Sequence, residues 1–166
     1  MIENLKNRFS LCRLFPCLFA LALFASSAAQ ALPTYRVSVD TGGHSGRALM
    51  DFTFLANAGA TPVTAILSNF GGAFAENFDR SSGAAGDIPG QVVLSNQGGG
   101  DYLTQFVQLG GLFSFDIRFD GAFATTENID ASLFAATLYN ADFTGYIGDA
   151  GSLVEFALTP QINGNP

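Results

Sequence analysis

Apolar and polar residues alternate along several short segments of the chain. In Leu112–Asp120, every second residue from Phe113 to Phe119 is apolar, and the residues between them are polar. Tyr35–Asp40 and Ala48–Ala56 alternate in the same way. Successive side chains of a strand point to opposite faces, so each segment has one apolar face and one polar face. The alternation predicts β-strands that lie between a core and water.

Five further segments also predict strands, and turn-forming residues, above all glycine, separate them. These segments are Thr61–Phe70, Gln91–Asn96, Tyr102–Leu109, Ser132–Tyr139 and Leu153–Thr159. About eight short strands with almost no helical periodicity favour an all-β fold, an antiparallel β-sandwich or jelly roll. A short helix competes only over Ile129–Ala136, and Asp79–Pro89 predicts a long surface loop.

The first 31 residues have the order of a secretory signal peptide. Three basic side chains within residues 1–13 precede the apolar run Leu14–Ala25, and small residues follow. Ala29 and Ala31 fit the A-x-A cleavage pattern, so we expect cleavage after Ala31 and a single β domain over residues 32–166. The twelve-residue apolar run is shorter than the ~20 residues of a membrane-spanning helix. We therefore expect no membrane span after cleavage.

Composition narrows the classes of function for the rest of the chain. Both cysteines, Cys12 and Cys17, and the single lysine lie in the N-terminal segment. Residues 32–166 hold four Arg and thirteen acidic residues, a net charge of −9. An acidic domain without lysine is poorly suited to bind nucleic acid or anionic membranes. A domain without cysteine has no disulfide, no thiolate nucleophile and no cysteine-ligated zinc.

Aromatic residues are frequent in residues 32–166, which contain thirteen Phe and four Tyr but no Trp. Phe at alternating positions, as in the pairs Phe113/Phe115 and Phe52/Phe54, is expected to fill the core. The alternative is an aromatic platform for a ligand, and sugar platforms more often use Trp and Tyr, whose polar edges tolerate water. The candidates for a ligand face are therefore Tyr102, Tyr139 and Tyr146.

The single histidine is the first candidate for catalysis. His44 lies beside Ser45 in a glycine-rich loop, with Asp40 and Asp51 in the neighbouring segments. The spacing matches no nucleophile elbow, and no strand–turn–helix pattern follows it. We therefore expect His44 to be a solvated loop residue.

Paired carboxylates are the second candidate. Asp116 and Asp120 share one face of a predicted strand, about 13 Å apart at ~3.3 Å per residue. Glycosidases use a separation of roughly 5–9.5 Å. Arg118 lies between the two acids and predicts a surface ion-pair ladder. A pairing with an acid on a neighbouring strand stays open, because it depends on the order of the strands. The sequence otherwise predicts no catalytic residues and a protein that is not an enzyme.

Calcium is the metal that this composition favours, because hard cations prefer oxygen ligands. The candidate ligands are Asp40, Asp142 and Asp149, each in a turn-like segment. None of these segments has the spacing of an EF-hand or of a calcium-binding β-roll. Acidic turns that face water are the competing interpretation.

Several strand segments are similar to those of one group of small exported bacterial proteins. The segments are Tyr35–Thr41, Met50–Phe54, Ala65–Phe70, Phe113–Ile117 and Phe134–Tyr139. Over about Tyr35–Thr159 the chain resembles proteins of the PEP-CTERM/exosortase system. Members of that family usually end in a Val-Pro-Glu-Pro-type motif, a transmembrane helix and an arginine cluster, and none of the three follows Thr159. The resemblance implies an exported protein of a Gram-negative bacterium, here without the sorting tail, and supplies no catalytic residues.

Together these observations predict a non-catalytic secreted protein of the bacterial envelope or extracellular matrix, in the periplasm or at the outer surface. The alternative is a glycan-binding jelly-roll module, with calcium as its candidate cofactor. The expected partners are extracellular polysaccharide or envelope components, and not nucleic acid. Since no lysine protects the strand edges, self-association through these edges is a further hypothesis.

Overall fold

The computed structural model describes residues 33–57, 59–121, 132–148 and 151–159. The chain divides into two compact units, Met1–Gln30 and Ala31–Pro166, and all the described residues belong to the second. The signal peptide predicted over residues 1–31, with Ala29 and Ala31 at its cleavage site, lies outside the described residues. Among the residues that are described, no helix is long and apolar enough to cross a membrane.

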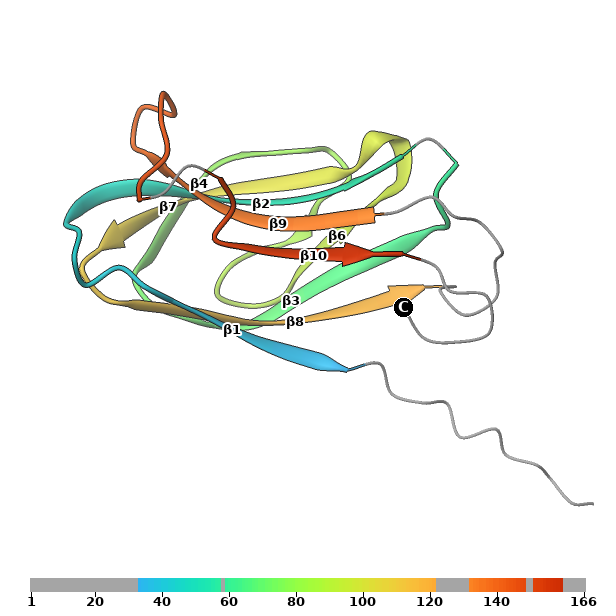
Figure 1. Cartoon of the computed structure of the whole chain (residues 1–166), viewed down its shortest axis with the longest axis horizontal. Coiled ribbons are helices and arrows are strands. Elements are labelled where there is room, and N and C mark those ends of the chain that lie inside the picture. Colours follow the sequence, from blue (N-terminus) through green and yellow to red (C-terminus); the bar gives the residue numbers. More distant parts are fainter. Residues whose placement is uncertain (1–32, 58, 122–131, 149–150, 160–166) are drawn as a thin grey trace, which may run out of the picture. The chain divides into compact units, whose positions relative to one another are not determined.

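The second unit consists of two antiparallel five-stranded sheets (Figure 1). The first sheet has the order β1-β8-β3-β6-β5, and the second has the order β10-β9-β2-β7-β4. The elements are β1 (Thr34–Asp40), β2 (Gly46–Ala56), β3 (Val63–Gly71), β4 (Phe74–Arg80), β5 (Ala85–Gly86), β6 (Val92–Ser95), the 3-10 turn η1 (Gln97–Gly99), β7 (Asp101–Leu109), β8 (Leu112–Gly121), β9 (Ser132–Asn140) and β10 (Val154–Leu158). The prediction of an all-β sandwich is confirmed, and all eight predicted strands are present within one or two residues of their expected ends.

The strand pairs are nested along the chain. β1 pairs with β8, β2 with β7 and β3 with β6, all antiparallel. Such nested pairs arise when one long hairpin is rolled into two sheets, which is how a jelly roll is connected. β9 pairs with the free side of β2, and β10 then pairs with β9. The two extra strands therefore widen the second sheet.

The core lies between the two sheets and is rich in phenylalanine. Phe52 and Phe54 of β2, Phe115 of β8 and Phe134 of β9 are fully buried. The rings of Phe115 and Phe52, one from each sheet, lie 5.2 Å apart at 84°, the edge-to-face arrangement that aromatic pairs prefer. The expectation that alternating phenylalanines fill the core is confirmed at these positions.

The strand β4 is not expected from the sequence. Its pairing with β7 shifts register twice, between Phe74 and Asn77 and between Asn77 and Asp79. Each irregularity changes which side chain points to which face, so the segment does not alternate in sequence. A prediction from the alternation of apolar and polar residues therefore misses β4.

The long surface loop predicted over Asp79–Pro89 is wrong in part, because the segment includes the end of β4 and the two residues of β5. The Arg80 guanidinium holds the connection together. It donates hydrogen bonds to the backbone carbonyls of Ala84 and Gly86 and lies 2.9 Å from a carboxylate oxygen of Asp87. One arginine thus orders a segment whose composition is typical of a loop.

The helix alternative at Ile129–Ala136 is wrong over its described part. Residues 132–136 belong to β9, which is paired along its length with β2 on one side and with β10 on the other. Two hydrogen-bonded neighbours outweigh the weak local preference of a short helix. Residues 129–131 lie outside the described residues.

Four strands form the edges of the two sheets, β1 and β5 in the first and β10 and β4 in the second. The irregular pairing of β4 is a known means of protecting an edge. Self-association through the other edges stays a prediction.

Candidate functional site

Five aromatic rings lie in a continuous row on the outer face of the second sheet. We call this row the aromatic ridge; it consists of Phe106, Phe78, Phe143, Tyr139 and Tyr146. In that order, successive ring centroids are 5.2, 6.2, 4.3 and 4.9 Å apart. Phe78, Phe143 and Tyr146 are each nearly half exposed, at 48, 44 and 49%. The ridge is thus an apolar surface that the chain leaves open to solvent.

The strand register places the ridge across the middle of the sheet. Leu49 of β2 faces away from the core and lies opposite Phe106 of β7 on one side and Tyr139 of β9 on the other. Leu49 is fully buried, so it forms the floor on which these rings lie. Covering Leu49 accounts for the positions of Phe106 and Tyr139 in the ridge. It does not account for the exposed rings of Phe78, Phe143 and Tyr146.

Phe143 reaches the ridge from the turn that follows β9. Its φ of 60° lies in the left-handed region, which is unfavourable for a bulky residue. The side chain of Asn140 fixes the turn, because its Oδ1 accepts hydrogen bonds from the backbone N–H groups of Thr144 (2.8 Å) and Gly145 (3.1 Å). Burial does not offset the cost of this backbone conformation, since the Phe143 ring is 44% exposed. The ring packs on Tyr139 and Phe78 at the surface, and backbone strain of this kind is found preferentially at functional sites.

Below the ridge, β2 carries a buried carboxyl group. Asp51 is only 8% exposed, although it faces away from the core, and its Oδ1 accepts a hydrogen bond of 2.6 Å from Thr104 Oγ1. Burial raises the pKa of Asp51 above its usual range, and the hydrogen bond from Thr104 opposes this change. Burial is the largest of the effects that raise the pKa of Tyr139 to about 12. A hydrogen bond with Tyr146 and the negative charges of Tyr146 and Asp51 raise it further in the same direction.

The raised pKa of Asp51 predicts the effect of removing its charge. Because folding raises the pKa of Asp51, the folded protein favours the protonated form of this carboxyl group. Its contribution to stability is therefore complete below the unfolded pKa of about 3.9, and it is lost as the pH rises through the folded pKa. Asp51→Asn, which keeps an acceptor for Thr104, should therefore raise the free energy of unfolding at pH 7 and leave it unchanged near pH 3. Urea denaturation at both pH values measures the effect, and the exposed Asp120→Asn serves as the control. A less stable Asp51→Asn at pH 7 would contradict the assignment.

One end of the ridge holds a positive charge of the chain itself. The guanidinium carbon of Arg47 lies 3.6 Å from the centroid of the Phe106 ring, and the same guanidinium forms an ion pair with Glu76 of β4. Both side chains are about half exposed or more. A cation over an exposed ring contributes roughly 0.5–1 kcal/mol. The face of the Phe106 ring is therefore accessible to a cation, which binds it through a cation–π contact.

The structure brings together two of the three tyrosines proposed as a ligand face. Tyr139 and Tyr146 lie side by side in the ridge and form an isolated bridge. Tyr102 lies on the same face, but it pairs with Thr53, four residues along β2 from Leu49 and so about 13 Å away. The Tyr102 hydroxyl donates a 3.0 Å hydrogen bond to Asp79, which raises the pKa of Tyr102.

Sequence reasoning missed the three phenylalanines of the ridge, Phe78, Phe106 and Phe143. Phe106 carried a usable signal, because alternation along β7 places it on the face opposite to the buried Leu103 and Val107. Phe78 lies in the irregular strand β4 and Phe143 in a turn, where no period indicates a face. Their place in the ridge depends on contacts between segments far apart in the chain.

The calcium candidates are engaged within their own turns. Asp40 Oδ1 accepts a 2.8 Å hydrogen bond from the backbone N–H of Gly42, and Asp142 Oδ1 accepts a 2.7 Å hydrogen bond from Thr144 Oγ1. Asp149 lies outside the described residues. Within the described ranges, no three acidic, histidine or cysteine side chains are grouped closely enough to hold a metal. Calcium binding stays a prediction.

The residues considered for catalysis lie apart. His44 is exposed in the β1–β2 turn, where its backbone N–H donates to the Thr41 carbonyl, whereas the Asp51 carboxyl faces Thr104. Asp116 and Asp120 lie on the same outer side of β8, as expected.

The predicted ladder from Asp116 through Arg118 to Asp120 is wrong at its first step. Asp116 pairs at 2.9 Å with Arg36 of the neighbouring strand β1, and Arg118 lies 3.9 Å from Asp120. Hydrogen bonds from Asn69 and Arg36 hold the pKa of Asp116 below its usual range. The cross-strand partner could not be identified without the register of β1 and β8.

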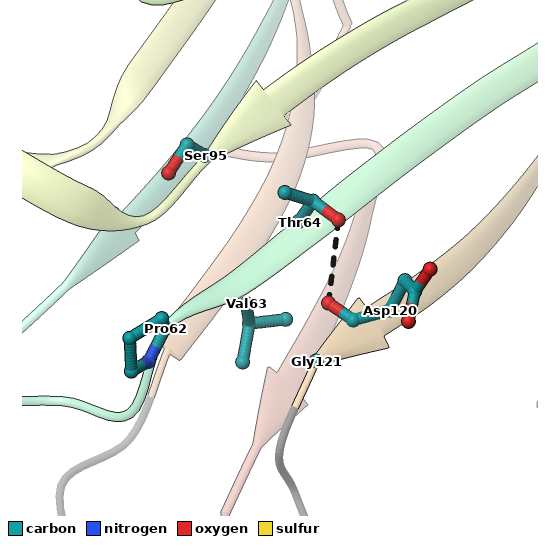
Figure 2. Close-up of a pocket in the computed structure, with 6 residues that line it drawn as sticks. All are labelled: Pro62, Val63, Thr64, Ser95, Asp120 and Gly121. Carbon is teal, nitrogen blue, oxygen red and sulfur yellow. Dashed lines mark hydrogen bonds between the residues drawn. The ribbon is translucent and has the colours of Figure 1, made fainter.

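Two cavities lie away from the ridge. The smaller, about 260 Å³, is shown in Figure 2 and is lined by Pro62, Val63, Thr64, Ser95, Asp120 and Gly121. The Thr64 hydroxyl donates a 3.3 Å hydrogen bond to the Asp120 carbonyl, and the Asp120 carboxylate points away from Pro62 and Val63. The larger, about 480 Å³, lies between the end of β2 and η1. In neither do charged side chains of the described residues converge, so the ridge is the stronger candidate site.

Comparison of the chain with protein-family models, curated proteins and solved structures finds no match. The likeness to exosortase-system proteins therefore stays a resemblance, and the proposals below rest on the residues and geometry of this chain.

Proposed function

We propose that this protein is an exported, non-catalytic binding protein of the bacterial envelope or extracellular matrix, and that its aromatic ridge binds a glycan. The observation that carries the proposal is the row of five rings, three of them nearly half exposed, on the outer face of a jelly-roll sheet. Sugar rings have apolar C–H faces that pack on aromatic rings, while their hydroxyls need polar partners nearby.

Both kinds of group are present at the ridge. The Tyr139 and Tyr146 hydroxyls belong to it, and the carboxylates of Glu76 and Asp79 lie on the neighbouring strand β4. The strained turn at Phe143 supports a role beyond packing, since it holds an apolar ring in solvent. Export and a place outside the cytoplasm are supported by the N-terminal sequence pattern alone.

Truncating ridge residues is expected to weaken glycan binding without unfolding the protein. Phe143→Ala and Tyr146→Ala should each weaken glycan binding about tenfold, the equivalent of about 1.4 kcal/mol. Their half-exposed rings contribute little to the core, so the melting temperature should change by only a few degrees. A glycan array, followed by calorimetry on the best neutral oligosaccharide, measures the effect.

Tyr35→Ala is the matched control, because Tyr35 is an equally exposed aromatic residue (44%) on the first sheet. Its binding should equal that of the unmodified protein. A parallel array with a chelator tests whether calcium takes part. Unchanged binding in both ridge variants, or no binding to any glycan, would contradict the proposal.

A further inference from the structure

In the part of the chain that the structure describes, each arginine is already paired with a carboxylate. All four arginines of residues 32–166 form ion pairs, and no lysine follows residue 6. The pairs are Arg36–Asp116, Arg47–Glu76, Arg80–Asp87 and Arg118–Asp120. A glycan that carries carboxylate, sulfate or phosphate groups would be repelled by a domain of net charge −9 whose arginines are already paired.

The ridge already shows how it receives a positive charge. The Arg47 guanidinium lies over the Phe106 ring, and Glu76 supplies the counter-charge. The ring attracts the cation through its negative face, and the carboxylate strengthens this attraction. Arg47 is the one cation found over a ring in the described part of the chain.

The next ring of the ridge is exposed, and a second carboxylate lies on the same face of the sheet. Phe78 lies 5.2 Å from Phe106 and is 48% exposed, and the adjacent residue Asp79 directs its carboxylate to the same outer face, where it accepts the Tyr102 hydrogen bond. Asp51 adds a further carboxyl group below the ridge. Three carboxyl groups therefore lie on the same face of the sheet as the rings, and the guanidinium of Arg47 is paired with one of them, Glu76.

We infer that the ligand of the aromatic ridge is a glycan with protonated amino groups, such as a polymer of de-N-acetylated hexosamine, whose ammonium groups lie over the rings beside Glu76 and Asp79. This inference rests on the proposed glycan-binding function and deepens it, because it names the charge of the ligand. The sugar C–H faces pack on the rings, and the carboxylates supply an attraction that salt screens.

Three hexasaccharides test the inference by calorimetry at pH 5.5, where sugar amines are protonated and surface carboxylates are ionised. They are the hexamers of glucosamine, N-acetylglucosamine and galacturonate. In 20 mM NaCl the glucosamine hexamer should bind at least tenfold more tightly than the N-acetylglucosamine hexamer. This difference should shrink in 300 mM NaCl, and the galacturonate hexamer should bind most weakly.

Charge variants separate a local effect from the net charge. Glu76→Gln should weaken binding of the glucosamine hexamer about fivefold, whereas Asp120→Asn, which removes an equal charge from the first sheet, should change it less than twofold. Arg47→Ala should tighten binding about threefold, because it uncovers the Phe106 ring and releases Glu76. Circular dichroism checks that each variant is folded. Weaker binding by a folded Arg47→Ala would overturn the inference.

The outcomes distinguish this inference from the function on which it rests. If the N-acetylglucosamine or galacturonate hexamer binds as tightly as the glucosamine hexamer, and Phe143→Ala still weakens binding about tenfold, then the amino-group inference is wrong and glycan binding stands. If Glu76→Gln and Asp120→Asn behave alike, the attraction comes from net charge and the inference is again overturned. If no hexamer binds but the glycan array shows another glycan whose binding Phe143→Ala weakens, the amino-group inference is wrong and glycan binding stands. If the array also shows no binding, or Phe143→Ala and Tyr146→Ala have no effect, both proposals fail.

Discussion

Replacing Phe115 with alanine is expected to remove about 3–5 kcal/mol from the free energy of unfolding. Phe115 is fully buried on β8, and its ring contacts Phe52 and Phe134 of the opposite sheet at centroid distances of 5.2 and 6.4 Å. The cavity left by the ring therefore opens between the two sheets, where both would have to move to fill it. Since domains of this kind are stable by only about 5–15 kcal/mol, the variant should be close to unfolding at room temperature.

Urea denaturation followed by far-ultraviolet circular dichroism measures this effect, and the absence of tryptophan makes the backbone signal the better probe. Phe115→Leu fills most of the space and should cost less than about 2 kcal/mol, so the series stays measurable if the alanine variant does not fold. Phe78→Ala is the matched control, because that ring is 48% exposed. If Phe115→Ala and Phe78→Ala cost the same, the core does not lie where the structure places it.

The second large effect is expected at Asn96, which is 3% exposed and follows β6. Its Oδ1 accepts a 2.9 Å hydrogen bond from the Val63 backbone N–H, and its Nδ2 donates to the Thr61 carbonyl (2.7 Å) and to Ser132 Oγ (2.8 Å). One side chain thus links the start of β3 in the first sheet to the start of β9 in the second. A buried polar group that loses its partner costs about 1–3 kcal/mol, so Asn96→Ala should cost about 2–4 kcal/mol.

The same denaturation experiment measures Asn96→Ala, with the exposed Asn57→Ala as its control. Asn96→Asp keeps the acceptor for Val63, but it loses the donor to Thr61 and Ser132 and buries a carboxylate that faces the Thr61 carbonyl, so at pH 7 it should be at least as destabilising as Asn96→Ala. An Asn96→Ala variant as stable as Asn57→Ala would mean that these hydrogen bonds contribute nothing to the joining of the sheets.

The alternation of apolar and polar residues was sufficient to predict a strand and its core face wherever one face is buried and the strand is regular. β8 alternates without interruption, so its core face, including Phe113 and Phe115, could be assigned from the sequence. β4 could not, because its two register shifts break the period of two. Alternation along β2 also places Asp51 on the outer face. The burial of Asp51 there depends on the neighbouring strands β7 and β9, which the sequence of β2 does not identify.

The candidate site was predictable only in its tyrosines. Tyr139 and Tyr146 were singled out by residue type, and the structure places them together. Phe78 and Phe143 join them because β4 lies at the edge beside β7 and because the turn after β9 brings its ring over the same face. Neither relation has a signature in a single segment of sequence.

The sequence by itself determined the all-β class, the position of most strands, the phenylalanine core and an acidic domain without lysine. These are properties of period and composition, which need no knowledge of neighbours. The tertiary structure alone decided that five rings form one ridge, that each arginine of the described residues is paired, and that Asp51 is buried on an outer face. The physical reason is that strand register and sheet order bring together residues that are far apart in the sequence, as in the nested pairing of β1 with β8 and of β2 with β7.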